Sequence, residues 1–496
     1  GESYDDDKSF IKFAEYLNAV EKEKIALMSL SCDVSESNRL FYFATPPNVF
    51  TDLSKNIKKH LSGNHKGWTR VIVEKPFGED LKSCDDLLRA MGEHLKENQI
   101  YRIDHYLAKE MVQNMLVLRF SNTLWDTIWD RRSIKCVKIS MKESEGVAGR
   151  GGYYDDYGVI RDVFQNHLIQ VLCLTAMEAP VSLHDDDIRD EKVKVLKAIE
   201  SPPLTNVVVG QYGRSLDDKQ ESYLEDPSIV SKNPKSKQLT FVQMVLFINN
   251  KRWAGVPFIC KCGKALDARN AEIRIQFKND GLCLYPNAVF NELAIRLQPS
   301  EAIWLRVNTK KPGFARLNST YSSDLDLTYQ SRFDNLVLPG AYTRLILDCL
   351  EGDQSLFVRD DELREAWRIV TPLLKKFEGD SSFKPPTYPR GSRGPPEADE
   401  MASRYGFLRS PESMKYGEET QRAPHEQKKE ISVYKKKKMD TKDEIKNMLP
   451  LVFESSNIHV HIFEKEYWNC FKDYQKNSEK KEKLMFESPR SWIDQL

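Results

Sequence analysis

The chain has 496 residues, more than one typical domain and enough to bury a large core. Lys and Arg together number 74 and so do Asp and Glu, so no net field favours nucleic acid or a membrane surface as a partner. No apolar stretch approaches the roughly 20 residues needed to cross a bilayer. Nine cysteines without framework spacing favour reduced thiols, no metal site and a cytosolic protein.

The N-terminal region alternates between predicted helices and strands. Apolar residues recur every three or four positions from Phe10 to Val20, which predicts a helix. The elements in chain order are a helix over 7–25, a strand over 40–44, a helix over 49–61, a strand over 71–73 and a helix over 80–97. This rhythm is typical of a parallel α/β sheet, in which ligands bind at the carboxyl ends of the strands.

The pattern changes after residue 105. The predicted elements are helices over 106–121 and 160–177 and strands over 135–142, 239–249, 272–277 and 293–297. They predict an α+β region with a mainly antiparallel sheet. Residues 380–400 are rich in Pro, Gly and Ser, which predicts an ordered wrap or a linker. From residue 411 the chain is rich in Lys and Glu, with a brief strand-like run at 451–463. This composition favours a solvated, disordered tail. The alternative is that Lys435–Lys438 contact nucleic acid or an acidic partner.

Residues 102–110 (RIDHYLAKE) are the segment that most clearly indicates a binding site. If a helix starts near residue 105, His105 and Lys109 lie one turn apart on the same face. Two such side chains at a helix N-terminus suit a phosphate dianion, because the free N–H groups and the helix dipole add to them. The alternative is that Asp104 is an N-cap and its neighbours are ordinary surface residues.

His167 lies on the apolar stripe of a predicted helix, together with Phe164 and Leu168. A histidine in that position is usually a satisfied core residue; the alternative is a general base oriented by a carboxylate. Asp162 is five residues earlier, about 140° around an ideal α-helix, and is therefore a poor local partner. Lys75, at a strand end before Pro76, is either a solvated loop residue or a bridge between a sugar oxygen and a coenzyme.

Long motifs in this sequence occur in the order that is found in glucose-6-phosphate dehydrogenases, and the chain resembles that family from about residue 36 to 408. The motifs are EKPFG (74–78), RIDHYLAKE (102–110), GRGGYYDDYGVIRDVFQNHL (149–168), RDEKVKVLK (189–197), CGKALDAR (262–269), LDLTY (325–329), DELREAWRI (361–369) and GSRGPPEAD (391–399). The resemblance implies oxidation of glucose 6-phosphate to 6-phosphogluconolactone with NADP, in a cytosolic homodimer or homotetramer built through the large sheet. It also implies three regions: a partial Rossmann-like NADP-binding domain at 1–104, an α+β domain at 105–410 and the extension at 411–496.

The resemblance assigns roles to individual residues. His167 would be the catalytic base and Asp104 its carboxylate partner. Lys75, which would also touch the coenzyme, is joined in the substrate site by His105, Tyr106, Lys109, Glu143, Asp162, Lys264, Arg269 and Gln298. Pro47 and Phe50 would lie near the coenzyme, and the bond before Pro76 would be cis. A second, structural NADP would be held by Lys261, Arg274, Arg296, Trp304, Arg306, Asp326 and Arg393.

The sequence also departs from the family pattern. The family opens with a strand, a Gly-x-x-Gly-Asp-Leu-Ala turn and a helix that hold the coenzyme diphosphate, and no such turn occurs here. Phe50 stands where a tyrosine is usual, and Asn270 where a basic residue is usual. The sequence therefore indicates either an incomplete copy of an active enzyme or a non-catalytic subunit that binds sugar phosphate. A lumenal hexose-6-phosphate dehydrogenase would need a larger C-terminal domain than the tail provides.

Overall fold

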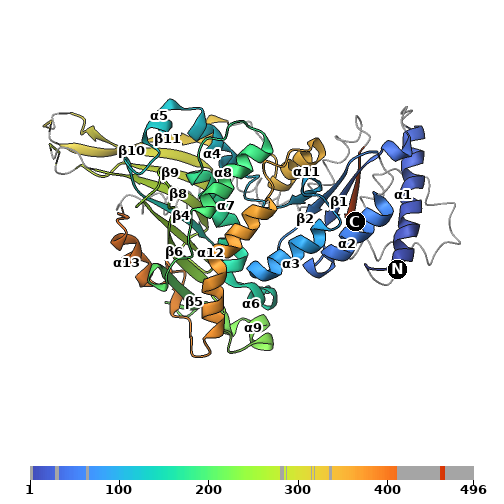
Figure 1. Cartoon of the computed structure of the whole chain (residues 1–496). Helices are drawn as coiled ribbons and strands as arrows, with labels where there is room; N and C mark the ends of the chain where they lie inside the picture. The colour runs from blue at the N-terminus through green and yellow to red at the C-terminus, as the bar shows by residue number, and fades with distance from the viewer. Residues whose placement is uncertain are drawn as a thin grey trace.

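The computed structural model describes residues 4–27, 33–62, 66–279, 284–285, 288–313, 316–317, 319–333, 338–409 and 458–463. The chain forms two regions, each built on its own sheet (Figure 1). Apart from 458–463, the predicted extension at 411–496 lies outside the described residues. None of the described helices is both long enough and apolar enough to span a bilayer.

The smaller sheet is parallel, as the alternation of elements predicted. Its strand order is β13-β1-β2-β3, with β1 at Asn38–Phe43, β2 at Thr69–Val73, β3 at Ile100–Arg102 and β13 at Ile458–Phe463. Of the strand-like run predicted at 451–463, the described residues 458–463 form β13, which pairs in parallel with β1, and 451–457 lie outside the described residues. The inner strands β1 and β2 are almost wholly buried, which explains their continuous apolar runs.

Helices flank this sheet close to the predicted positions. They are α1 (Asp7–Leu27), the 3₁₀ turn η2 (Pro47–Val49), α2 (Phe50–Asn56), the π-helical turn η3 (Ile57–Leu61) and α3 (Leu81–Gly92). Asp80 caps α3 by accepting from the backbone N–H of Ser83. The helix predicted over 80–97 is shorter than expected, because a 3₁₀ turn at Glu97–Gln99 leads into β3.

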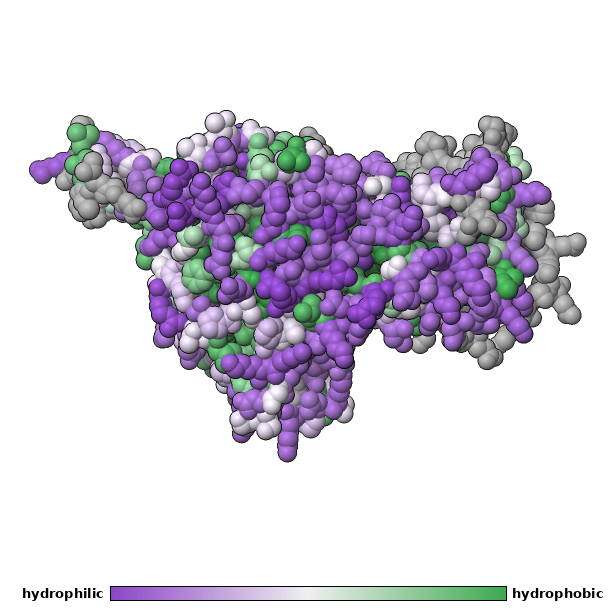
Figure 2. Space-filling view, in the orientation of Figure 1, coloured by the Kyte–Doolittle hydropathy of each residue, from purple (hydrophilic) through white to green (hydrophobic). Residues whose placement is uncertain are grey.

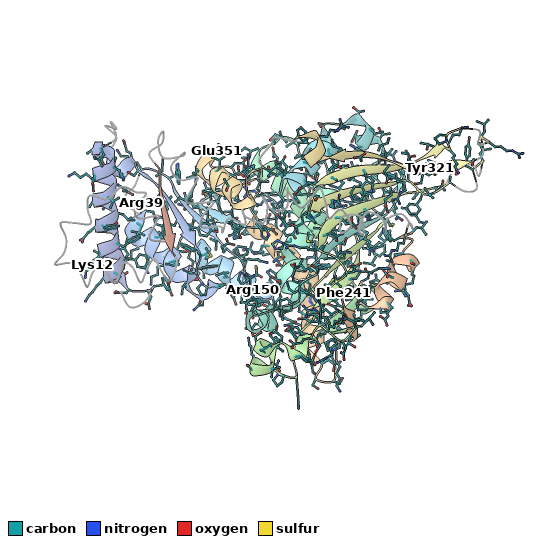
Figure 3. All side chains as sticks on the ribbon, turned by 180° about the vertical axis from the view of Figure 1, so that it is seen from behind. Lys12, Arg39, Arg150, Phe241, Tyr321 and Glu351 are labelled. Carbon is teal, nitrogen blue, oxygen red and sulfur yellow. The ribbon has the colours of Figure 1, made fainter. Side chains whose placement is uncertain are left out.

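The larger sheet has nine strands and is mainly antiparallel, as predicted. Its order is β11 (Thr320–Thr328), β10 (Ala302–Lys310), β9 (Glu292–Gln298), β8 (Asn270–Phe277), β4 (Ile134–Lys142), β7 (Pro257–Gly263), β6 (Phe241–Phe247), β5 (Val207–Ser215) and β12 (Thr387–Arg390). Among the described strands of this sheet, β4 with β7 and β5 with β12 pair in parallel, and the other neighbours pair antiparallel. β10 and β11 project from the body of the molecule, where Tyr321 is labelled in Figure 3.

Helices of the second region lie between the two sheets and around the larger one (Figure 1). They are α4 (Glu110–Phe120), α5 (Thr123–Ile128), α6 (Gly151–Val159), the π-helical η5 (Ile160–Leu168), α7 (Ile169–Ala176), α8 (Asp185–Lys197), α9 (Pro227–Lys232), α10 (Tyr329–Arg332), α11 (Ala341–Glu351), α12 (Asp360–Gly379) and α13 (Pro396–Arg404). Every residue of α7 is buried, so it forms the centre of the helical layer. The face in Figure 2 is mostly hydrophilic, with apolar residues in small separate groups.

A buried ion pair fastens α1 to the first strand of the smaller sheet. The guanidinium of Arg39, labelled in Figure 3, donates to Glu21 at 2.7–2.8 Å, to Asn18 and to the carbonyl of Leu61. Arg39 is 1% exposed and Glu21 is 0% exposed. Because both charged groups are removed from water, the loss of either one would leave the other charge buried without a partner.

We expect Arg39→Met to lower the free energy of unfolding by about 3–5 kcal/mol, since it leaves the Glu21 carboxylate buried and unpaired. Denaturant titration followed by circular dichroism measures the change. Arg89→Met is the matched control, because Arg89 forms a surface pair with Asp86 and its loss should change stability by no more than about 0.5 kcal/mol. Equal effects of the two substitutions would contradict the assigned role of the pair.

Candidate active site

The predicted site residues meet where three segments converge at the carboxyl ends of β2 and β3. These segments are the strand end at 74–78, the turn at 103–109 and the π-helical η5. A pocket lies between them, in the position that parallel sheets favour for ligands. Its lining includes Lys75, Phe77, Asp104, Asp162, His167 and Trp367.

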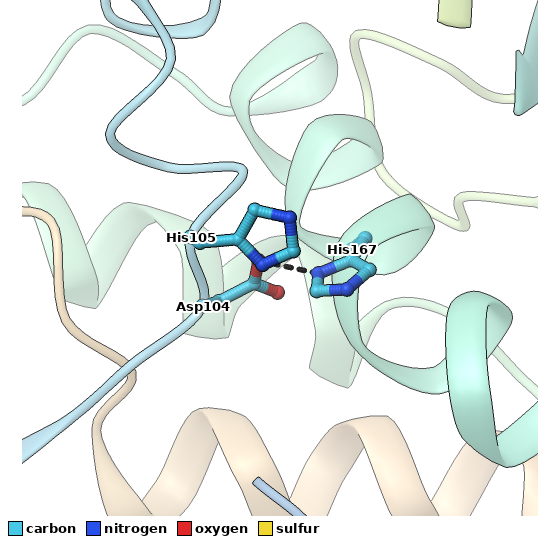
Figure 4. A group of neighbouring side chains, drawn as sticks. All are labelled: Asp104, His105 and His167. Carbon is cyan, nitrogen blue, oxygen red and sulfur yellow. Dashed lines mark hydrogen bonds and ion pairs between the residues drawn. The ribbon is translucent and has the colours of Figure 1, made fainter. Parts of the chain in front are cut away.

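His167 and Asp104 both line this pocket, and their side chains lie in direct contact (Figure 4). The Nδ1 atom of His167 lies 2.6 Å from Oδ1 of Asp104, and the two residues are 4% and 3% exposed. Burial alone would raise the pKa of Asp104, but His167, His105 and the backbone N–H of Tyr106 lower it to about 2. The ionised carboxylate therefore accepts a hydrogen bond from the protonated Nδ1 of His167, which leaves Nε2 with its lone pair.

The turn before α4 corrects one sequence-based expectation. We expected a helix from about residue 105, whereas α4 begins at Glu110 and Lys109 is its N-cap residue. Oδ1 of Asp104 accepts from the backbone N–H of Tyr106 at 3.0 Å, which holds a turn instead. His105 therefore does not lie at the N-terminus of α4, and the free N–H groups and dipole of that helix do not explain phosphate binding at His105.

Aromatic rings from this turn surround His167. The ring of Tyr106 stacks on His167 with a centroid distance of 4.5 Å, and His105 meets it edge-on at 4.6 Å. The Nζ atom of Lys109 lies 5.0 Å from the centroid of Tyr106. Burial and the nearby cations lower the pKa of His105 to about 3, so this ring is neutral in the ligand-free protein.

The helix that carries His167 has a different geometry from the one we assumed. Residues 160–168 form a π-helix, with hydrogen bonds from i to i+5 instead of i to i+4. Residues five apart therefore fall near the same side, and the separation of about 140° expected for Asp162 is wrong. Nζ of Lys75 contacts both residues, at 3.3 Å from Oδ1 of Asp162 and 3.2 Å from Nε2 of His167.

Lys75 acts on the charge of His167 from the opposite side to Asp104. Its Nζ also donates to the backbone carbonyl of Asp162 at 2.9 Å. Burial is the main cause that lowers the pKa of His167, the Lys75 cation lowers it further, and Asp104 opposes both. The net direction is downward, so His167 is an unprotonated base near neutral pH. The Lys75–Pro76 bond is cis, as the resemblance implied.

The larger domain supplies further polar groups. Lys264 pairs with Glu143 and lies 3.6 Å from Oδ2 of Asp162. Burial opposes the charge of Lys264, but the two carboxylates outweigh it and raise its pKa. Gln298 donates to the hydroxyl of Tyr106 at 2.9 Å. Arg269 lies at the rim, where its side chain is 61% exposed and pairs loosely with Glu145.

The two residues expected on the coenzyme side behave differently. Pro47 opens the 3₁₀ turn that follows β1, at the carboxyl edge of the smaller sheet. Phe50 is 0% exposed and packs against Phe43. The structure therefore gives Phe50 a core position instead of a ligand-facing one, because its ring completes the packing between α2 and the sheet.

Sequence reasoning missed a group beside the site. The carboxylate of Glu74 accepts hydrogen bonds from Tyr42 and from Tyr342, which lies in the first turn of α11. Glu74 stands inside the EKPFG motif directly before Lys75, which was the available signal. Tyr342 and Tyr42 carry no comparable signal, because only the folded chain brings them to Glu74.

Residues proposed from the resemblance for a second NADP gather on one face of the larger sheet. The register places Lys138, Arg274, Ala294, Trp304 and Asp326 opposite one another across β4, β8, β9, β10 and β11. The guanidinium groups of Arg274 and Arg296 lie 5.6 and 5.4 Å from the Trp304 ring.

The remaining residues of that set adjoin the same face. Arg306 follows Trp304 two positions later on β10, and Lys261 on β7 pairs with Ser140 of β4. Nζ of Lys261 donates to the backbone carbonyl of Arg393 at 2.6 Å. Glu272 and Glu292 pair with Arg274, so part of the positive charge is already balanced.

Comparison with known proteins identifies relatives along most of the chain. Residues 3–114 match the family described as "Glucose-6-phosphate dehydrogenase, NAD binding domain", and residues 116–410 match "Glucose-6-phosphate dehydrogenase, C-terminal domain". A glucose-6-phosphate 1-dehydrogenase of Takifugu rubripes is 51% identical over 386 residues, which are 77% of this chain and 71% of that protein. A cytoplasmic isoform from Solanum tuberosum is 47% identical over 421 residues, 81% of this chain and 79% of that protein.

A solved structure is similar over a comparable span. It is described as glucose-6-phosphate dehydrogenase in complex with its substrate glucose-6-phosphate, and it is 43% identical with a TM-score of 0.76. The similarity covers 83% of this chain and 82% of that one.

The electrostatics of the pocket predict opposite shifts for two substitutions. Lys75→Met removes a cation that disfavours the imidazolium, so the pKa of His167 should rise. Asp104→Asn removes the carboxylate that favours the imidazolium, so the same pKa should fall. NMR of ¹³C-labelled histidine across a pH series measures both. Lys58→Met, which removes an exposed cation on η3, is the control, and shifts in the same direction for both variants would refute the arrangement.

Proposed function

The chain belongs to the glucose-6-phosphate dehydrogenase family, and on that premise we propose that His167 is the catalytic base of its reaction. The chain is an NADP-dependent oxidoreductase that converts D-glucose 6-phosphate to 6-phospho-D-glucono-1,5-lactone, the first step of the oxidative pentose phosphate pathway. The observation that supports the role of His167 is its 2.6 Å contact with Asp104 inside the pocket.

The proton and the hydride leave the sugar from neighbouring atoms. Nε2 of His167 accepts the proton of the C1 hydroxyl while the C1–H bond breaks and its electron pair departs as hydride, so that a C=O bond forms. NADP, when bound, accepts that hydride. Asp104 holds the ring by Nδ1 and stabilises the imidazolium that forms. General-base assistance of this kind contributes about 10²- to 10⁴-fold in rate.

Lys75 has two parts in this proposal. In the ligand-free protein its Nζ donates to Nε2 of His167, the atom that must accept the substrate proton. The sugar hydroxyl takes that place, and Lys75 is then free to contact sugar and coenzyme. Its charge keeps His167 unprotonated before the reaction and stabilises the oxyanion character that develops at C1. Pro47 remains the proposed second contact on the coenzyme side.

The sugar phosphate is bound by the residues around this base. We assign the phosphate to His105, Tyr106 and Lys109, whose side chains gather beside His167. A phosphate dianion that enters this cluster favours protonation of His105, whose charge is disfavoured in its absence. The sugar hydroxyls are assigned to the ion-paired and hydrogen-bonded groups nearby: Glu143, Asp162, Lys264, Arg269 and Gln298.

We expect His167→Ala to lower kcat for NADP reduction by about 10²- to 10⁴-fold and to change KM for glucose 6-phosphate far less. In the unmodified protein kcat/KM should rise with pH through the pKa of His167, at a value below the ordinary 6.5 or so of histidine, because the base must be unprotonated. Absorbance of NADPH measures both. His184→Ala, on an exposed side chain, is the control, and normal turnover by His167→Ala would overturn the assignment.

We also propose that the polar face of the larger sheet binds a second, structural NADP. Its supporting features are the guanidinium groups of Arg274 and Arg296 near the Trp304 ring and the buried guanidinium of Arg306. Nε and Nη1 of Arg306 have no hydrogen-bond partner among the described residues and only long ion pairs, at 3.5 Å to Asp324 and 3.6 Å to Glu292. Guanidinium groups suit phosphate oxygens and aromatic rings suit the adenine plane. Asn270, in place of a basic residue, removes one charge from this set.

If the second site exists, excess NADP should raise Tm by several degrees, and Arg296→Ala should remove most of that increase. Isothermal titration should fall from two NADP per chain to one in this variant, whereas Arg214→Ala, in an exposed pair on β5, should keep both. A single NADP in the unmodified protein would exclude the second site.

We propose a cytosolic homodimer or homotetramer. The cytosolic location is supported by similarity to the cytoplasmic isoform from Solanum tuberosum. The assembly is supported by β11, which lies at the edge of the large sheet and exposes Tyr321 and Leu325 to 54% and 62%. Exposed apolar side chains on an open strand edge are suited to association with a second copy.

A further inference from the structure

Glu74 is a partly buried carboxylate one residue before Lys75, at the end of β2. Two phenol hydroxyls donate to it, one from Tyr42 in β1 and one from Tyr342 in α11. Burial raises the pKa of Glu74, and the two tyrosines and Lys75 act against that rise. The ionised form of Glu74 is therefore stabilised by hydrogen bonds from the two tyrosines and by the charge of Lys75, which replace contacts with water.

Tyr342 links this carboxylate to the proposed phosphate-binding turn. Its ring is nearly parallel to that of His105, with an interplanar angle of 9° and a centroid distance of 6.1 Å. His105 in turn meets His167 edge-on. Tyr342 thus contacts Glu74 through its hydroxyl and faces His105 with its ring, and the two contacts can be removed separately.

The same carboxylate fixes the chain from which Lys75 extends. Glu74 is tied to a neighbouring strand on one side and to a helix of the larger domain on the other. Its backbone is therefore held where the next residue must reach 3.2 Å from Nε2 of His167 and 2.9 Å from the carbonyl of Asp162. A displacement of about 1 Å at such a position is enough to lower a rate substantially.

We propose that Glu74 is a positioning residue for the reaction, which sets Lys75 against His167, and that the ring of Tyr342 separately sets His105 for the sugar phosphate. This inference rests on the proposed function. Glu74 itself touches neither reacting group: it acts on kcat through Lys75, and Tyr342 acts on sugar-phosphate binding through its ring.

The hydroxyl and the ring of Tyr342 separate the two effects. Tyr342→Phe keeps the ring beside His105 and removes the hydrogen bond to Glu74, so kcat should fall about tenfold with KM for glucose 6-phosphate within about twofold of normal. Tyr342→Ala also removes the ring, so KM should rise in addition. If Tyr342 had only a structural role, the two substitutions would not affect kcat and KM separately.

Glu74→Gln keeps the shape of the side chain and loses its charge. It should show the same loss of kcat as Tyr342→Phe, and the double variant should lose little more, because both substitutions break one hydrogen-bonded unit. Tyr101→Phe is the matched control: it removes the hydroxyl of a buried tyrosine in β3 that is 1% exposed, and it should leave both constants unchanged. Tm is measured for every variant, so that a fall in kcat without a fall in Tm excludes unfolding.

The outcomes distinguish this inference from the function on which it rests. An unmodified chain that reduces no NADP with glucose 6-phosphate would refute the proposed function. An active unmodified chain whose Glu74→Gln and Tyr342→Phe variants keep kcat within twofold would refute the positioning role alone. If Glu74→Gln unfolds, Tyr342→Phe decides the question, since it removes one hydroxyl from a partly exposed residue.

Discussion

The burial of an imidazole beside a carboxylate is the constraint on which the site depends. Desolvation disfavours the charged form of both Asp104 and His167, and the contact with His167 offsets that cost for the Asp104 carboxylate. Asp104 keeps its charge because His167 and a backbone N–H satisfy one of its oxygens. His167 stays neutral because burial and Lys75 outweigh the carboxylate. The result is a base whose proton-accepting nitrogen is fixed before substrate arrives.

The π-helical turn η5 makes this arrangement possible. Its i to i+5 bonds bring Asp162 and His167 to one side, where a single Lys75 amine contacts both. The chain enters η5 through Gly158, whose φ of 66° favours glycine. A side chain there would place its Cβ 2.0 Å from Oε1 of Gln238. The kink that precedes η5 therefore favours a glycine at position 158, a residue that touches no substrate.

Local periodicity predicted most elements, because strands and helices leave their repeat in the apolar residues. It placed His167 on an apolar stripe but could not choose between a core residue and a base. Its partner Asp104 is 63 residues earlier, and only the family resemblance paired them. The prediction assumed an α-helical repeat of about 3.6 residues, so it could not identify the π-helix. It also placed the start of α4 too early, because it did not foresee the turn held by Asp104. Contacts such as Tyr342 with Glu74 leave no local signal at all.

The strand order explains why Glu74 can serve as a fixed point. β1 lies between β13 and β2, so both of its edges are hydrogen-bonded, and Tyr42 pairs with Ile462 on one side and Ile72 on the other. A strand paired on both edges moves less than an edge strand, because each displacement breaks two ladders. The hydroxyl of Tyr42 therefore offers Glu74 a rigid support on the sheet side, whereas Tyr342 comes from a helix of the other domain. Glu74 is therefore supported by a strand of the smaller sheet on one side and by a helix of the larger domain on the other.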